Sequence, residues 1–121
     1  MAKHNILGRE GEEIAARYMV EHGYTVLDRN WRSGHKELDM VARRDDTLVF
    51  LEVKTRCGRR FGNPQDAVDV RKIMRTVNAA DAYIRHHALD MDVRFDIFTV
   101  VFENGTDTTE HIEDAFYPPL Q

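Results

Sequence analysis

Residues 37–54 read ELDMVARRDDTLVFLEVK. This stretch predicts a β-hairpin in the middle of a sheet, and the fold class follows from it. The runs 38–42 and 47–53 are apolar and β-prone, and the charged segment 43–46 separates them. Apolar residues occupy both faces of the two predicted strands, which is typical of a central sheet covered on each side by helices. The hairpin therefore predicts an α/β fold.

The register of this hairpin places charged residues opposite one another. A two-residue loop at 45–46 brings Asp39 directly opposite Glu52, and it brings Glu37 opposite Lys54. Directly opposed Cβ atoms lie about 4.5–5.5 Å apart on one face of a sheet. Glu52 and Lys54 share that face because side chains alternate along a strand. A slip of one residue would send Asp39 to the other face and remove the pairing.

Two opposed carboxylates inside an apolar hairpin repel each other, and burying them unpaired is costly. A divalent cation between Asp39 and Glu52 removes both problems. Oxygen ligands at this separation suit Mg²⁺, with Mn²⁺ as an alternative. Lys54 would direct an ammonium group at the same spot, where it could hold a phosphate or orient a water molecule. A salt-bridge cluster of these residues with Glu37, without chemistry, is the other interpretation.

Length and composition indicate one globular domain spanning residues 1–121. The apolar fraction is 42% and the charged fraction 31%. No apolar run approaches the roughly 20 residues of a membrane helix, and the N-terminus lacks the apolar core of a signal peptide. Cys57 is the single cysteine, which excludes an internal disulfide and fits a reducing compartment. We therefore expect a cytoplasmic protein with no membrane partner.

The net charge of −4 is unevenly distributed along the chain. Residues 54–75, called here the basic segment, carry seven basic and two acidic residues, whereas residues 76–121 carry two basic and nine acidic residues. Phosphate binding depends on a local positive surface more than on the overall charge. The basic segment is therefore a candidate nucleic-acid contact, although Arg59 and Arg60 could equally decorate a solvated loop.

The first predicted helix covers residues 8–22 and ends at Gly23. Gly11 lies near the middle of its apolar face, which suggests a close approach between helix and sheet. Glu12 lies at the edge of that face and can look toward a sheet packed beneath the helix. The alternative for Glu12 is a boundary position paired with a basic surface residue.

The remaining pattern completes the order αβββαββ. A strand is predicted at 24–31 and a loop at 55–62. A helix starts at Asn63 and Pro64 and runs to about residue 87, with a possible break near Asp69. Further strands are predicted at 93–103 and 106–112, joined by a hairpin turn at Asn104 and Gly105.

Several motifs together are similar to a known family. They are G-x-x-G-E in the first helix, D-R-N-W-R, E-L-D-x-V-A, F-L-E-V-K-T-R, F-G-x-P-x-x-A-V and R-F-D. In this order, and across nearly the whole chain, they resemble the YraN-like family of uncharacterised bacterial proteins, which is related to archaeal Holliday-junction resolvases. The resemblance implies a restriction-endonuclease-like core, with a central mixed sheet flanked by helices.

The resemblance also implies roles for individual residues. Asp39 and Glu52 match the metal-binding carboxylates, together with the carbonyl of Val53, and Lys54 matches the lysine of Glu-x-Lys. Glu12 matches the first-helix glutamate that completes the site in resolvase-like relatives. The glycine that usually precedes Glu37 is replaced here by Lys36, so the loop geometry departs from the family pattern. The residues expected to hold a nucleic-acid backbone are Arg56, Arg59, Arg60, Lys72 and Arg75.

The implied activity is metal-assisted hydrolysis of phosphodiester bonds in DNA, possibly branched or damaged DNA, by a Mg²⁺-dependent endonuclease. Two other functions fit the same residues. One is a non-catalytic nucleic-acid-binding module of the same fold, and the other is a protein-interaction domain that uses the acidic C-terminal third. The kinship to resolvases, which act as symmetric pairs, is also consistent with a homodimer.

Overall fold

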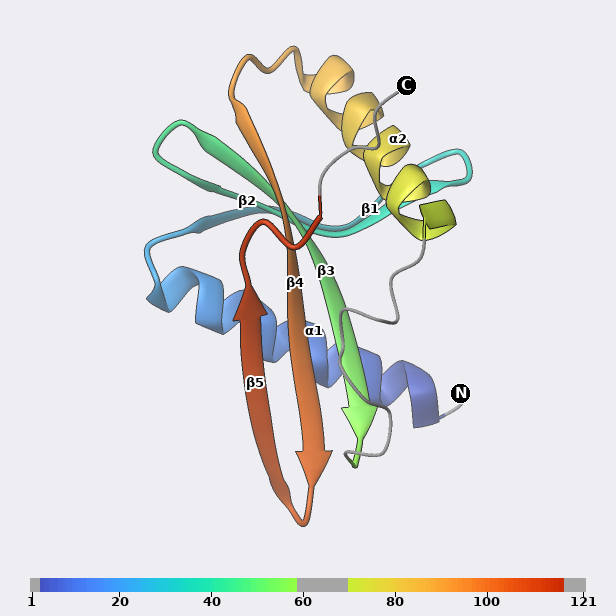
Figure 1. The fold of residues 1–121 in the computed structure, drawn as a ribbon, viewed down its shortest axis with the longest axis vertical. Helices are drawn as coiled ribbons and strands as arrows, with labels where there is room; N and C mark the ends of the chain where they lie inside the picture. The colour runs from blue at the N-terminus through green and yellow to red at the C-terminus, as the bar shows by residue number, and fades with distance from the viewer. Residues whose placement is uncertain (1–2, 59–69, 117–121) are drawn as a thin grey trace.

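A computed structural model describes residues 3–58 and 70–116 of the chain. Over these residues the fold is α/β, with two helices and a five-stranded mixed sheet (Figure 1). The elements in chain order are α1 (Lys3–Glu21), β1 (Thr25–Ser33), β2 (Lys36–Arg44), β3 (Thr47–Cys57), α2 (Val70–His87), β4 (Asp92–Glu103) and β5 (Thr106–Ile112). The predicted order αβββαββ is confirmed.

The strands lie side by side in the order β1-β2-β3-β4-β5. Neighbouring strands pair antiparallel except for β3 and β4, which are parallel. A parallel pair requires a long crossover connection, and α2 lies within that crossover. This arrangement is compatible with a restriction-endonuclease-like core.

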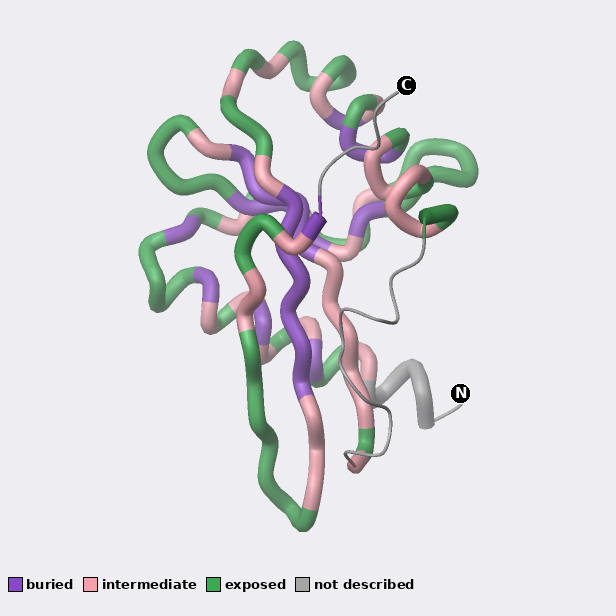
Figure 2. Tube along the Cα trace, in the orientation of Figure 1, coloured by how far each residue is buried: buried purple, intermediate pink, exposed green. Residues whose placement is uncertain are grey.

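Each helix covers one face of the sheet. Along β3, Leu48 and Phe50 pack in a core cluster with Tyr83 of α2, while Val49 and Leu51 pack in a second cluster with Met19 of α1. Buried residues run along the central strands and exposed residues along β5 (Figure 2). The alternation of faces along a strand, together with apolar residues on both faces, produces this three-layer arrangement. Among the described helices, none is both long and apolar enough to cross a membrane.

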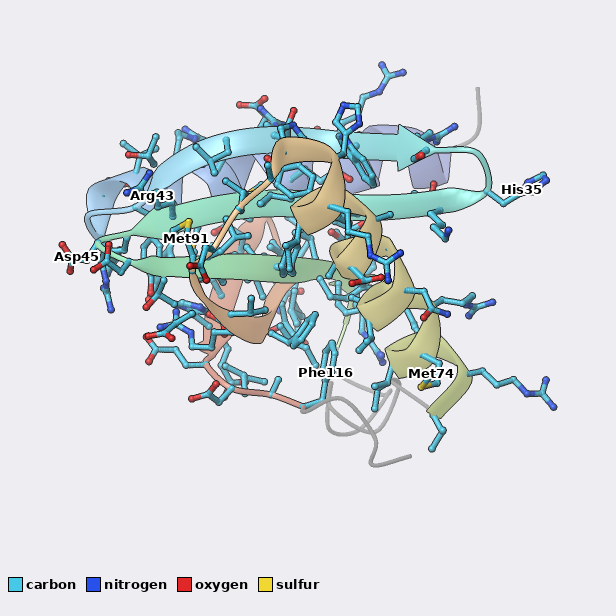
Figure 3. All side chains as sticks on the ribbon, turned by 90° about the horizontal axis from the view of Figure 1, so that it is seen from above. His35, Arg43, Asp45, Met74, Met91 and Phe116 are labelled. Atoms are coloured by element: carbon cyan, nitrogen blue, oxygen red, sulfur yellow. The ribbon has the colours of Figure 1, made fainter. Side chains whose placement is uncertain are left out.

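The predicted register of the central hairpin is confirmed. The β2–β3 pairs run from Met40↔Leu51 to Arg44↔Thr47, so the loop between them has two residues. Asp45 in this loop has a φ of 54°, the left-handed conformation that tight hairpin turns require. Figure 3 shows this turn, marked by Asp45, at one end of β2 and the β1–β2 turn, marked by His35, at the other end.

The sheet forks where β2 and β3 part. Beyond Met40↔Leu51, β2 continues along β1 as far as Ser33↔Lys36, whereas β3 continues along β4 as far as Cys57↔Phe102. In Figure 1 the β1–β2 hairpin turns away behind α2, while β3, β4 and β5 run on together. Beyond the fork, the facing backbone edges of β2 and β3 no longer pair with each other.

The fork overturns one prediction from the register. The pairing of β2 with β3 ends before it reaches Glu37, so Glu37 and Lys54 are not a cross-strand pair. Glu37 instead forms an exposed ion pair with Arg32 of β1, with 3.5 Å between Glu37 Oε2 and Arg32 Nε.

Some predicted boundaries also differ from the structure. α1 begins at Lys3 rather than at residue 8, so Gly8 lies inside the helix. Residues 55–57, predicted as loop, extend β3 because β4 offers them a parallel partner up to Phe102. The predicted start of the second helix at Asn63 and Pro64 lies outside the described residues. The described part of that helix begins at Val70.

The close approach of α1 to the sheet is confirmed at Gly11. A Cβ atom added to Gly11 would lie 2.0 Å from Oγ1 of Thr55 in β3, which is far inside contact distance. The absence of a side chain at Gly11 therefore lets α1 lie directly against the part of β3 that follows the fork. This contact brings the neighbouring Glu12 to the sheet.

Candidate metal and nucleic-acid site

Asp39 lies at the fork of the sheet. Its Oδ2 atom accepts a hydrogen bond from the main-chain N–H of Val53 at 2.9 Å. In a continuing antiparallel ladder a main-chain carbonyl of β2 would take such a bond. The carboxylate of Asp39 therefore replaces a backbone partner at the point where the two strands separate, and this bond fixes its direction toward β3.

Asp39 and Glu52 form a hydrogen-bonded carboxyl pair one position beyond the last β2–β3 backbone pair, Met40↔Leu51, where extending the predicted register places them. Burial, followed by the neighbouring negative charge of Glu52, raises the pKa of Asp39 to about 7. At neutral pH the two groups can share a proton, with Asp39 as the hydrogen-bond donor to Glu52. Without a cation, the pair therefore carries less negative charge than two ionised carboxylates. A bound cation would favour ionisation of both.

Two lysines from different elements converge on Glu52. Nζ of Lys54 in β3 lies 3.3 Å from Oε1 of Glu52, and Nζ of Lys72 in α2 contacts the same oxygen. Burial opposes ionisation of Glu52, but the hydrogen bond and charge of Lys72, followed by the charge of Lys54, lower its pKa overall. Burial and the neighbouring Lys72 lower the pKa of Lys54. Glu52 is therefore ionised, and the two lysines compensate its charge.

Glu12 reaches the site from the opposite face of the sheet. It is half-buried on α1, and its negative charge contributes to the raised pKa of Asp39. Its Oε1 atom accepts a hydrogen bond from Nδ2 of Asn30 in β1 at 3.1 Å. Glu12 thus faces the sheet, as its place at the edge of the apolar face of the helix predicts. Because the strands part at Asp39, groups from both helices can approach that carboxyl.

A cleft of about 610 Å³ opens onto the carboxyl pair. One wall is the turn of the β1–β2 hairpin and the other is the first half of α2. The lining residues are His35, Lys36, Glu37, Asp39, Glu52, Lys72, Arg75, Thr76 and Asn78. The acidic pair lines the cleft together with basic side chains from both walls and the acidic Glu37. A cleft of this polarity can accept a phosphate group next to a divalent cation.

The basic residues predicted to hold nucleic acid have different positions. Arg75 lines the cleft, and Arg56 of β3 shares the face of Glu52 and Lys54 because side chains alternate along the strand. Lys72 is on the cleft wall but also binds Glu52, a role that the sequence did not indicate. Arg59 and Arg60 lie outside the described residues.

The residues at the fork fit a hard divalent cation with few protein ligands. Within residues 3–58 and 70–116, no three His, Cys, Asp or Glu side chains converge on one metal position, so a cation at the carboxyl pair would have two side-chain ligands. Since the N–H of Val53 points to the fork, its C=O points to the same edge of β3. Two carboxylates and one carbonyl, with water or phosphate completing the shell, match the preference of Mg²⁺.

Sequence reasoning missed two contributors to this site. The link between Glu52 and Lys72 depends on how α2 docks over β3, which spacing along the chain does not reveal. Asn30 belongs to the motif D-R-N-W-R, yet nothing in that motif by itself predicts a contact with α1. Trp31 of the same motif packs against the core cluster beneath α2, in edge contact with Tyr83.

The fold and the site together define an α/β protein with a forked mixed sheet, in which an acidic pair and a lysine meet at the fork. Comparison with known sequences gives the family: the chain belongs to the Uncharacterised protein family UPF0102, whose sequence model matches residues 11–100. This result confirms the resemblance to YraN-like proteins.

Similar proteins match along nearly their full length. A UPF0102 protein of Bacteroides thetaiotaomicron is 55% identical over 120 residues, which cover 99% of each chain. One from Phocaeicola vulgatus is 53% identical with the same coverage. One from Parabacteroides distasonis is 50% identical over 121 residues, the whole of both chains. The chain therefore has the length of these relatives.

Proposed function

We propose that this protein is a metal-dependent endonuclease that hydrolyses phosphodiester bonds in DNA. The observation that supports this proposal most strongly is the buried carboxyl pair of Asp39 and Glu52, with the ammonium of Lys54 3.3 Å from Glu52. An acidic pair that lines a cleft with several basic residues, and that has a further lysine in contact with Glu52, combines a cation site with a phosphate site. Both are needed for metal-assisted phosphodiester hydrolysis.

The chain supplies the groups that such a reaction needs. Asp39, Glu52 and the carbonyl of Val53 would hold the cation. When bound there, Mg²⁺ supplies Lewis acidity that acidifies water and withdraws charge from the phosphoryl group. Lys54 would orient the attacking water or donate a hydrogen bond to the phosphoryl oxygen as negative charge develops on it.

The walls of the cleft would hold the DNA backbone. Arg75 lines the cleft directly, and Arg56 lies on the same face of β3 as the site. Contacts to phosphates position a nucleic acid without reading its sequence. We therefore propose that the protein selects DNA by structure rather than sequence. The kinship to junction resolvases makes branched or damaged DNA the substrate class to examine.

The test is a cleavage assay with linear, flapped and four-way DNA in Mg²⁺ and in Mn²⁺. The proposal expects cleavage by the wild-type protein and at least about a hundredfold loss in Lys54→Ala, the range found when one charge-stabilising donor is removed. Glu52→Gln, which loses a carboxylate ligand of the cation, should also lose cleavage. Glu110→Gln, an exposed acid on β5, is the matched control and should cleave normally. Salt-dependent binding without cleavage would show a non-catalytic binding module instead. Absence of DNA binding at low salt would favour a protein-interaction domain.

A further inference from the structure

Two consecutive residues of β1 hold two consecutive glutamates of α1. Nη1 of Arg29 lies 2.7 Å from Oε1 of Glu13. Nδ2 of Asn30 donates to Oε1 of Glu12 at 3.1 Å. The first contact is an ordinary ion pair between a helix and the edge strand beneath it. The second lies next to the acidic pair, because the pairing of β1 with β2 leaves Asn30 across from Asp39.

This arrangement is unexpected in a regular strand, where successive side chains point to opposite faces. Arg29 is opposite Met40, which packs in the core cluster on the α1 face. Regular alternation would direct the next side chain toward α2. Asn30 instead has a φ of 53°, the left-handed conformation. Trp31, which follows, packs on the α2 face although it is two residues from Arg29. The alternation is therefore interrupted at Asn30, and its side chain joins that of Arg29 on the α1 face.

Asparagine meets two demands at this position. Among L-residues, Asn and Asp adopt the left-handed conformation most readily, and Gly adopts it without penalty. Gly has no side chain to donate a hydrogen bond to Glu12. Asp would place a second carboxylate against Glu12 and repel it. The amide of asparagine combines the required backbone conformation with a donor, which neither Gly nor Asp does.

The pairing of β1 with β2 also places Asn30 next to the site. The pairs Arg29↔Met40 and Trp31↔Leu38 leave Asn30 across from Asp39. The residue of β1 at which the alternation of side chains is interrupted thus lies beside the point where β2 and β3 separate. We propose that Asn30 is a positioning residue that directs the carboxylate of Glu12 toward the cation site at Asp39. This proposal rests on the proposed function and gives Asn30 the role of fixing the direction of Glu12, which lies beside the carboxyl pair and is not itself one of three converging ligands among the described residues.

The test is a double-mutant cycle with Mn²⁺ affinity, measured by calorimetry without DNA, as its readout. Asn30→Gly keeps the backbone conformation and removes only the amide. We expect Asn30→Gly and Glu12→Gln each to weaken Mn²⁺ binding about tenfold, the lower end of what loss of such supporting hydrogen bonds costs. The double variant should bind no more weakly than Glu12→Gln alone, because Asn30 acts through Glu12. Arg29→Ala removes the neighbouring contact and is the matched control, with unchanged affinity.

Three results would overturn the proposal: wild-type affinity in Asn30→Gly, additive losses in the double variant, or no Mn²⁺ binding by the wild-type protein. Cleavage assays on the same proteins separate this inference from the proposed function. If the protein cleaves DNA and Asn30→Gly leaves its Mn²⁺ affinity unchanged, the positioning role is refuted and the proposed nuclease activity is not. The expected cycle in a protein that cleaves no DNA supports the positioning role and refutes the nuclease.

Discussion

The side chain of Asp39 accepts a hydrogen bond from the main-chain N–H of Val53 at 2.9 Å, immediately beyond the last β2–β3 pair. This single contact joins the two strands at the point where the sheet forks. It also holds a carboxyl group beside Glu52 in a buried position, where two negative charges are costly. The fork is therefore both the structural irregularity of the sheet and the centre of the candidate site.

Asp39 should make the protein less stable as the pH rises. Its pKa is about 7 in the folded chain against 3.8 when unperturbed, so the folded state binds the proton more tightly. The stability associated with that proton is fully present below the unfolded pKa and is lost as the pH rises through about 7. Asp39→Asn retains an acceptor for Val53 and carries no charge. We expect its melting temperature to exceed that of the wild type at pH 8, with the difference shrinking toward pH 5.

Thermal melts across this pH range measure the effect, with the exposed Asp90→Asn as the control. A lower melting temperature for Asp39→Asn at pH 8 would contradict the interpretation of Asp39 as a destabilising buried acid. The same variant should lose Mn²⁺ binding. The combination of increased stability and lost binding is typical of a residue retained for function.

Lys72 should compete with a divalent cation for Glu52. Its ammonium contacts the Oε1 atom that would also bind the cation. Lys72→Ala removes this competitor, so we expect Mn²⁺ affinity in the absence of DNA to rise several-fold in calorimetry. DNA binding should weaken, since a basic residue is lost from the wall of the cleft. Decreased Mn²⁺ affinity in Lys72→Ala would show that Lys72 supports the cation site instead. Arg85→Ala, at the far end of α2, serves as the control.

A residue larger than glycine at position 11 should destabilise the packing of α1 on the sheet. The added Cβ of Gly11→Ala would meet Oγ1 of Thr55 at 2.0 Å and push α1 off the sheet. We expect a loss of about 1–3 kcal/mol in the free energy of unfolding, as for other overpacked sites. Gly8→Ala is the matched control, because nothing lies within 4 Å of its added Cβ. It should stabilise the helix by up to about 1 kcal/mol. Equal effects of the two substitutions in denaturant melts would refute the close approach.

Asp96 of the R-F-D motif should be structural. It is fully buried, with its carboxylate bound by Arg94 at 2.8 and 2.9 Å and by Nε2 of His111 at 2.7 Å. Burial opposes its ionisation, but His111 and then Arg94 lower its pKa overall. Its contribution to stability is therefore present above the unfolded pKa and is lost as the pH falls through the folded pKa.

We expect Asp96→Asn to cost about 3–5 kcal/mol at neutral pH, because it leaves Arg94 without its buried partner. Denaturant melts measure the loss, and Asp92→Asn, exposed on the same strand, is the control. A loss below about 1 kcal/mol would show that the buried ion pair contributes little.

The sequence predicts the hairpin well because local patterns determine it. The two-residue loop at 45–46 and the alternation along 47–53 set the register, and that register brings Asp39 to Glu52. The fork could not be predicted in the same way. Whether β2 stays with β3 or leaves it depends on competing partners, β1 and β4, that lie far away in the chain. The mistaken pairing of Glu37 with Lys54 results from extending a local register past this point.

The position of Lys72 shows a second limit. Its charge and its place in a basic segment predict a phosphate contact, and it does line the cleft. Its contact with Glu52 depends on the docking of α2 over the sheet, which is a tertiary property. Asn30 is similar, because its contact with Glu12 requires both a left-handed residue within β1 and the close packing of α1 at Gly11.

The central claim is that Asp39 and Glu52 jointly bind one divalent cation at the fork. Anomalous diffraction from crystals soaked in Mn²⁺ tests it most directly, since the signal locates the metal without reference to activity. The account predicts one dominant peak within about 2.0–2.3 Å of an oxygen from each carboxylate, the coordination distance of hard divalent cations. That peak should vanish in Glu52→Gln. A peak elsewhere on the protein, or none under saturating Mn²⁺, would contradict the account.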